Sequence, residues 1–241
     1  MARLFAELDS QPTHLGEISL RRRLIPTLGD DYIYEVKLGD EFLMSSLFVD
    51  AEVALADLGL AATPGQQLKV VVGGLGLGYT AQAALKDPRI ARLLVVEALA
   101  PVIDWHKKAL VPVGEALNND TRCHYILGSF FELAKPELGF DPDTPGALFD
   151  AILLDIDHSP SEFLNSENAG FYTGDNLRAM AQQIKPGGVF AMWSQNPPDA
   201  QFIALLESVF AKVTSELVSF YNPFAQVEAS NSVYIAHTHQ S

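Results

Sequence analysis

The sequence predicts a doubly wound α/β fold preceded by a smaller β region, and three observations support this prediction. Short apolar runs recur between residues 68 and 193, and most of them end at a glycine or an acid. Segments with helical apolar spacing separate several of these runs. Runs that are apolar on both faces are typical of parallel strands covered by helices on both sides. A glycine-rich turn after the first run is the third observation, and strand–helix alternation of this kind gives a doubly wound sheet.

Residues 1–62 are expected to form the small β-rich region. Its strands are expected at residues 18–20, 32–38 and 42–48. Gly-Asp pairs between these segments are turn signals. A helix is predicted over residues 50–60, and Pro64-Gly65 then marks a break. We therefore place the start of the α/β domain, residues 63–241, just before this break.

The α/β domain shows the alternation in order. Its parallel strands are predicted at residues 68–72, 92–96, 124–127, 149–154 and 189–193. A helix begins near Ala81, and the apolar residues from Leu177 to Ile184 follow the spacing i, i+3, i+4, i+7. Asp199 is a candidate N-cap for another helix. Residues 212–220 and 232–236 are expected to close the fold as two strands.

Composition excludes several classes of function. The chain has 241 residues with 16 Lys and Arg against 30 Asp and Glu, and a net charge of -14 argues against nucleic-acid binding. A single cysteine, Cys123, allows no intrachain disulfide and no cysteine-based zinc site. His237 and His239 have no acidic neighbour that would complete a metal site. Without a membrane-length apolar stretch or a signal-peptide core, we expect a cytoplasmic protein with no membrane partner and no metal.

The most informative segment runs from the first parallel strand into the loop that contains Gly73, Gly74, Gly76 and Gly78. Glycines allow tight turns and a close approach of the backbone to a ligand, and the following helix presents free N–H groups. Glu97 ends the next strand. An acid at this place can accept hydrogen bonds from both hydroxyls of a ribose. The segment therefore predicts a nucleoside-containing ligand.

Two ligands fit the glycine pattern. The spacing Gly76-x-Gly78-x-x-Ala81 matches a dinucleotide fingerprint and keeps NAD as a candidate. The alternating Gly74, Gly76 and Gly78 are usual for ligands of the S-adenosylmethionine type. The loop alone leaves both open.

The chain resembles the spermidine synthase (polyamine aminopropyltransferase) family over residues 68–188. The matching stretches are residues 71–78, 95–97, 102–104, 128–132, 149–155, 171–172 and 185–188. The resemblance implies a class I S-adenosylmethionine methyltransferase-like (Rossmann-like) doubly wound sheet, with a small N-terminal β region that folds over the active site. It also implies S-adenosylmethionine or its decarboxylated form as co-substrate and an amine as acceptor. By the same resemblance, Gly128, Ser129 and Asp155 are expected to bind the co-substrate.

This chain departs from the family pattern at the positions that bind the substrates and carry out catalysis. Gly76 stands where the family has an Asp that holds the aminopropyl amine, and Ser129 replaces an Asp that contacts adenine. The family's Tyr-His pair does not occur before Gly73. After Asp155, His158 falls where the family has its catalytic base, and Asp157 lies one residue earlier. An imidazole can serve as a base at neutral pH. We therefore take Asp155, His158 and Asp157 as the candidate catalytic residues.

The glycine at position 76 carries a further expectation. Without the acid, the loop N–H groups are expected to stay free to meet an anion. Intact S-adenosylmethionine should then be accepted at least as well as the decarboxylated form, and the protein should not be an efficient putrescine aminopropyltransferase. Trp193, Ser194 and Gln195 are expected at the acceptor pocket, and Tyr79 is a candidate for stacking on the ligand.

We expect a spermidine synthase-like transferase that uses an S-adenosyl-type nucleoside and a small-molecule acceptor. A methyltransferase, an NAD-dependent oxidoreductase and a non-catalytic nucleoside-binding protein remain alternatives. A homodimer is kept as an expectation about assembly.

Overall fold

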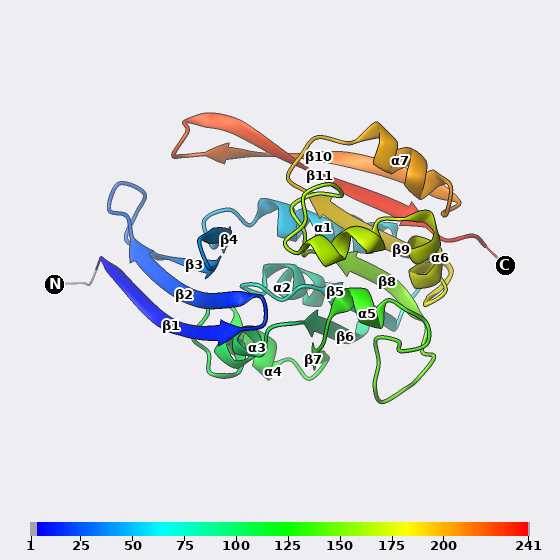
Figure 1. Cartoon of the computed structure of the whole chain (residues 1–241), viewed down its shortest axis with the longest axis horizontal. Coiled ribbons are helices and arrows are strands. Elements are labelled where there is room, and N and C mark those ends of the chain that lie inside the picture. Colours follow the sequence, from blue (N-terminus) through cyan, green and yellow to red (C-terminus); the bar gives the residue numbers. More distant parts are fainter. Residues whose placement is uncertain (1–3, 241) are drawn as a thin grey trace.

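A computed structural model describes residues 4–240, which form a four-stranded and a seven-stranded sheet (Figure 1). The smaller sheet is antiparallel and runs in the order of the chain. Its strands are β1 (Phe5–Thr13), β2 (Gly16–Leu24), β3 (Tyr32–Leu38) and β4 (Glu41–Ser45). The strand β1 was not predicted, because its polar residues and Pro12 give little strand signal. It forms as an edge strand through its pairing with β2.

The larger sheet has the order β10-β11-β9-β8-β5-β6-β7. Its strands are β5 (Leu68–Gly73), β6 (Ile90–Glu97), β7 (Cys123–Leu127), β8 (Phe149–Leu154), β9 (Ile184–Ser194), β10 (Lys212–Asn222) and β11 (Val227–His237). Pairings from β7 to β9 are parallel, whereas β11 and β10 are added antiparallel. This mixed, doubly wound sheet confirms the predicted fold class.

Helices cover both faces of the larger sheet. They are α1 (Asp50–Ala62), α2 (Tyr79–Leu85), α3 (Ala100–Lys107), α4 (Gly114–Asn119), α5 (Phe130–Leu133), the 3-10 helix η1 (Ser166–Phe171), α6 (Gly174–Ala181) and α7 (Ala200–Glu207). Within β5, Val70 and Val72 join one core cluster and Val71 joins the other. A strand buried on both faces explains why its sequence is continuously apolar. None of the helices within residues 4–240 combines the length and apolarity that crossing a bilayer requires.

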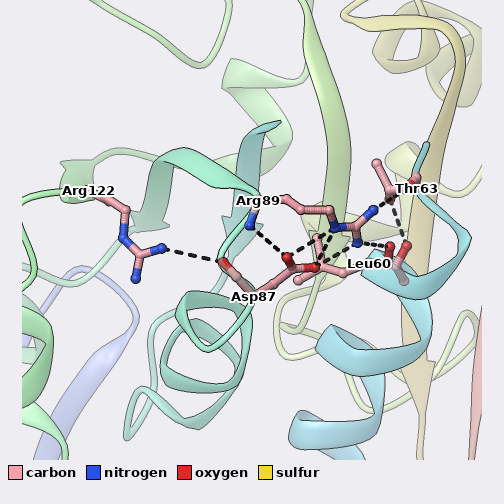
Figure 2. A network of polar contacts seen from close by, with 6 residues as sticks. Leu60, Thr63, Asp87, Arg89 and Arg122 are labelled. Carbon is pink, nitrogen blue, oxygen red and sulfur yellow. Dashed lines mark hydrogen bonds and ion pairs between the residues drawn. The ribbon is translucent and has the colours of Figure 1, made fainter. Parts of the chain in front are cut away.

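The helix α1 is fixed to the larger sheet. It packs against α2, β9 and β11. At its carboxyl end, the Arg89 guanidinium donates hydrogen bonds to the carbonyl oxygens of Leu60 (2.7 Å) and Thr63 (2.9 Å), and Asp87 holds the same guanidinium (Figure 2). A cation at this end also complements the helix dipole. Packing thus groups α1 with the larger sheet, although the boundary expected at residue 62 places it with the β region.

The smaller sheet lies against the carboxyl ends of β5 and β6. Ile18, Leu20 and Val36 share a core cluster with Leu75 and Leu99. The indole Nε1 of Trp105 in α3 donates to Asp9 Oδ2 of β1 at 2.7 Å, and this bond lowers the pKa of Asp9. In Figure 1 the blue strand β1 accordingly ends beside α3. Ligands of open α/β sheets bind outside the carboxyl ends of the strands, so the smaller sheet covers that place.

Candidate active site

A cavity of about 470 Å³ lies between the two sheets. The smaller sheet contributes Phe42 and Met44 to its lining, and α1 contributes Glu52. Residues at the carboxyl ends of the parallel strands complete it: Gly74, Leu75, Gly76, Glu97, Ser129, Asp155, His158 and Trp193. A shallower hollow of about 500 Å³ beside Arg89 holds none of the predicted site residues. The first cavity therefore brings together most of the residues that the sequence singled out.

Glu97 is held in place by backbone donors. Its Oε2 accepts from Leu75 N at 3.0 Å, and its Oε1 accepts from Leu99 N at 2.9 Å. Burial raises the pKa of Glu97, while these backbone hydrogen bonds oppose the rise. A carboxylate offers about four lone-pair positions. The N–H groups of Gly76 and Ala98 also stabilise its charged form, so the backbone holds this carboxylate in a fixed orientation in the cavity wall.

The glycine loop is shaped by two close approaches. Gly74 has a φ of 94°, and a Cβ there would collide with the carbonyl oxygen of Asp155. Gly76 has a φ of 49°, and its Cβ would collide with the sulfur of Met44. Both positions combine a left-handed backbone with contact, so the glycines bring the loop against β8 and against the smaller sheet.

The loop N–H groups are not free, which corrects the expectation drawn from Gly76. Leu77 N donates to Met44 Sδ at 3.0 Å, and Gly78 N donates to Leu75 O at 2.7 Å. Leu75 N is taken by Glu97. The physical reason is the smaller sheet, which places a thioether acceptor over the loop.

Three of the predicted ligand-binding glycines do not line the cavity. A Cβ at Gly73 would collide with the Phe130 ring, and Gly78 backs onto His106. Gly128 lies against Leu133. Their contact with a ligand stays a prediction, whereas Ser129, which precedes α5, lies in the cavity wall.

Asp155 and Glu52 both line the cavity and interact electrostatically. Asp155 Oδ2 accepts from Thr80 Oγ1 at 2.5 Å. Burial raises the pKa of both acids, and the charge of Asp155 raises that of Glu52 further. Because Thr80 stabilises the charged form of Asp155, we assign the proton of this pair to Glu52.

Sequence reasoning missed Glu52. Its only signal was an acid in the first turn of a helix, which is ordinarily explained by the helix dipole. No motif indicated that this turn would face Asp155.

His158 and Asp157 have different surroundings. His158 lines the cavity, and its Nε2 lies 3.0 Å from Glu41 Oε1 of β4. Asp157 is 1% exposed and accepts hydrogen bonds from Leu164 N, Asn168 Nδ2 and Tyr172 OH, each at 2.8 Å. Burial raises the pKa of Asp157, and the three donors oppose that rise. These bonds occupy Asp157 in anchoring the segment after β8, while His158 is presented to the cavity.

The predicted acceptor-pocket residues also separate. Trp193 and Tyr79 line the cavity, and burial raises the pKa of Tyr79. Ser194 is fully buried, and Gln195 donates to Glu162 at 2.9 Å. Neither Ser194 nor Gln195 belongs to the cavity lining.

The cavity has an unbalanced charge. Its lining includes Glu52, Glu97 and Asp155, whose pKa values burial raises. Glu132 and Glu167 also line it but are exposed, and Glu132 pairs with Lys135 outside the lining. Among the described residues that form this lining there is no Lys or Arg. Buried carboxylates favour a cationic ligand, because opposite charges are strengthened where water is excluded.

Comparison with known proteins gives the relationship of the chain. No family model matches it. It is 26% identical over 143 residues to a polyamine aminopropyltransferase of Bacillus cereus (strain ATCC 10987 / NRS 248). The matched segment covers 59% of this chain and 46% of that protein. With the polyamine aminopropyltransferase of Nitrosomonas europaea it shares 29% identity over 161 residues, 64% of this chain and 45% of the relative. The matches thus span less than half the length of these relatives.

Solved structures show the fold. The spermidine synthase of Thermotoga maritima superposes with a TM-score of 0.72 at 18% identity, over 98% of this chain and 74% of that chain. A spermidine synthase in complex with the transition state analogue AdoDATO superposes with a TM-score of 0.70 at 18% identity. This superposition covers 98% of the present chain and 73% of the other. The chain is therefore similar in sequence to polyamine aminopropyltransferases over part of their length, and similar in fold to spermidine synthases.

Proposed function

We propose that the protein transfers the aminopropyl group of a decarboxylated S-adenosyl nucleoside to an amine. One observation carries this proposal: a single cavity is lined by both Glu97 and the Glu52–Asp155 pair, and its lining, all within the described residues, contains no Lys or Arg. Glu97 suits a ribose diol, and the Glu52–Asp155 pair suits a positively charged amine. The names of the relatives support the same chemistry.

In this reaction the neutral nitrogen of the acceptor attacks the methylene next to the donor's sulfonium. A C–N bond forms, the C–S bond breaks with its electron pair going to sulfur, and methylthioadenosine leaves. The new nitrogen then loses a proton. His158 lies in the cavity wall and is our candidate for receiving it, held by Glu41 at 3.0 Å. Glu97 and the acidic pair contribute alignment of the two substrates.

The same features disfavour an intact S-adenosylmethionine as donor. Its carboxylate would meet Asp155 without a cation to balance it, and like charges at ~4 Å cost several kcal/mol in a partly buried site. Leu77 N, which could have received the carboxylate, is engaged by Met44. We therefore reverse the expectation that the carboxylated donor binds at least as well.

Incubation of the protein with decarboxylated S-adenosylmethionine and a panel of primary diamines of three to five carbons tests the proposal. We expect methylthioadenosine that appears only when an amine is present. Formation of S-adenosylhomocysteine from intact S-adenosylmethionine would instead identify a methyltransferase. Turnover of NAD would identify an oxidoreductase, and ligand binding without any product would identify a non-catalytic protein. The homodimer stays a prediction, which light scattering of the purified chain would test.

A further inference from the structure

We propose that Glu52 is the residue that selects a cationic amine, by giving up the proton of the Glu52–Asp155 pair when an ammonium group binds between the two carboxyls. This inference rests on the proposed function for the identity of the ligand. It adds a specificity-determining residue that no motif of the chain indicates.

The position of Glu52 is fixed by its helix. Glu52 lies in the first turn of α1, one turn before Leu55, which is fully buried in the core. The other end of α1 is clamped by Arg89 (Figure 2). Within residues 4–240, the Glu52 carboxyl has no ion pair and no hydrogen bond to another residue's side chain, although it lines the cavity. The helix therefore holds an unpartnered carboxyl group at a constant place in the cavity wall.

The groups around Glu52 favour its protonated form when no cation is bound. Asp155, which follows β8, and Asp50, in α1 itself, act on Glu52 through their charges, and Glu52 acts in the same way on Tyr79 of α2. Asp155 and Asp50 both raise the pKa of Glu52, in addition to the larger effect of burial. None of these neighbours is cationic. An ammonium group between Glu52 and Asp155 would remove the repulsion and favour the doubly charged pair, so the proton would leave to solvent.

The glycine loop cannot supply this carboxylate. The space beside Gly76 is occupied by the Met44 sulfur, which also accepts the Leu77 N–H. The carboxylate that pairs with the ammonium group must therefore come from another wall of the cavity, and Glu52 of α1 is placed to provide it.

Aromatic residues complete the surroundings of this carboxyl. Trp193 and Tyr79 line the same cavity. Ring faces attract ammonium groups and pack against methylene chains. The Trp193 Nε1–H is buried and has no acceptor in the part of the chain that the structure describes. It is a donor available to a ligand, independent of the acidic pair.

Calorimetric titration tests the inference directly. 1,4-Diaminobutane is titrated into the full chain saturated with methylthioadenosine at pH 7, in two buffers with different ionisation enthalpies. We expect binding to release a proton. Glu52→Gln should weaken binding of the diamine at least tenfold, worth ~1.4 kcal/mol. The same variant should abolish the proton release. Asp57→Asn is the matched control, because it removes an exposed charge from the outer side of the same helix.

Other outcomes are equally decisive. Proton release that persists in Glu52→Gln overturns the inference, even when affinity falls. Unchanged affinity in this variant overturns it as well. Gln keeps the shape of a protonated carboxyl, so we expect an unaltered circular dichroism spectrum. Glu52→Asp, which keeps the carboxyl, should restore part of the release. Binding of methylthioadenosine to the unchanged chain is measured first, without amine. If this nucleoside does not bind, the result counts against the proposed function. Titration of the diamine into the chain without nucleoside would then still test Glu52.

Discussion

The Nε2 atom of His158 lies 3.0 Å from Oε1 of Glu41, and this pair joins the segment after β8 to the last strand of the smaller sheet. A base that must receive a proton has to be held at a fixed distance from the acceptor nitrogen. Glu41 fixes the imidazole from a different sheet, so the arrangement of the two sheets determines where the base stands.

Substitution of this pair should therefore reduce turnover more than binding. We expect His158→Ala to lower kcat by about 10²–10⁴-fold, which is the usual contribution of a general base. Glu41→Ala should lower kcat by about tenfold with little change in KM, because the imidazole remains but loses its orientation. Asp40→Asn, at the exposed neighbouring position, is the control. Steady-state kinetics of methylthioadenosine release measures all three, and full activity in His158→Ala would assign the proton to another group.

Glu97 should govern the nucleoside. We expect Glu97→Ala to weaken the binding of methylthioadenosine by ~1–3 kcal/mol, because the substitution removes charge-assisted hydrogen bonds. Calorimetry measures the affinity, and Glu207→Ala on the exposed side of α7 serves as control. Equal affinities in wild type and Glu97→Ala would contradict the assignment of the ribose to this residue.

Stability should decrease as pH rises. Burial raises the pKa of Glu52 from 4.5 to about 8 and that of Asp155 from 3.8 to about 6. Between about pH 4 and 8 these two groups bind more protons in the folded chain than in the unfolded chain, so their contribution to the free energy of unfolding falls with increasing pH. Burial lowers the pKa of His106 and His237, which act in the opposite direction over part of this range. A loss of ~1 kcal/mol lowers Tm by about 2–4 °C in a chain of this size.

Thermal unfolding in the absence of ligand, followed from pH 5 to 8.5, checks this sign. Glu97 and Asp157, whose pKa values burial also raises, act in the same direction. Glu52→Gln should therefore reduce the slope without removing it. An identical slope in wild type and Glu52→Gln would show that Glu52 is ionised in the folded chain without ligand.

Gly76 and Met44 should be energetically coupled. A side chain at position 76 meets the Met44 sulfur and a left-handed backbone, so we expect Gly76→Asp to destabilise the chain by ~1–3 kcal/mol. Met44→Ala opens the space, and the double variant should lose less stability than the sum of the two single changes. Urea unfolding of the four proteins gives the coupling. Strict additivity would mean that the sulfur moves aside at no cost.

The sequence predicted the elements whose pattern is local. Apolar runs such as residues 68–72 and 149–154 fall within the strands observed, because burial on both faces leaves a continuous signal. The place of Glu97 followed from the glycine loop in the same way. In contrast, β1 has a polar sequence and forms only through its partner strand.

The missed parts of the site depend on contacts between distant segments. Met44 lies 33 residues before the N–H that it covers, and Glu52 meets Asp155 only after α1 has packed on the larger sheet. Asp157 and His158 are neighbours in the chain, but one faces inward to three donors and the other faces the cavity. Sequence order cannot distinguish these orientations.

Arg89 holds the carboxyl end of α1, so a small tilt of the helix about that end is amplified at Glu52. A helix of 13 residues is about 20 Å long, so a tilt of only a few degrees at the Arg89 end would move the Glu52 end by ~1 Å. Displacements of that size can change a rate by ~10²-fold. Substitutions outside the cavity, at Arg89 or at the Asp87 that holds it, could therefore retune which amine length fits, while every residue that touches the ligand stays the same.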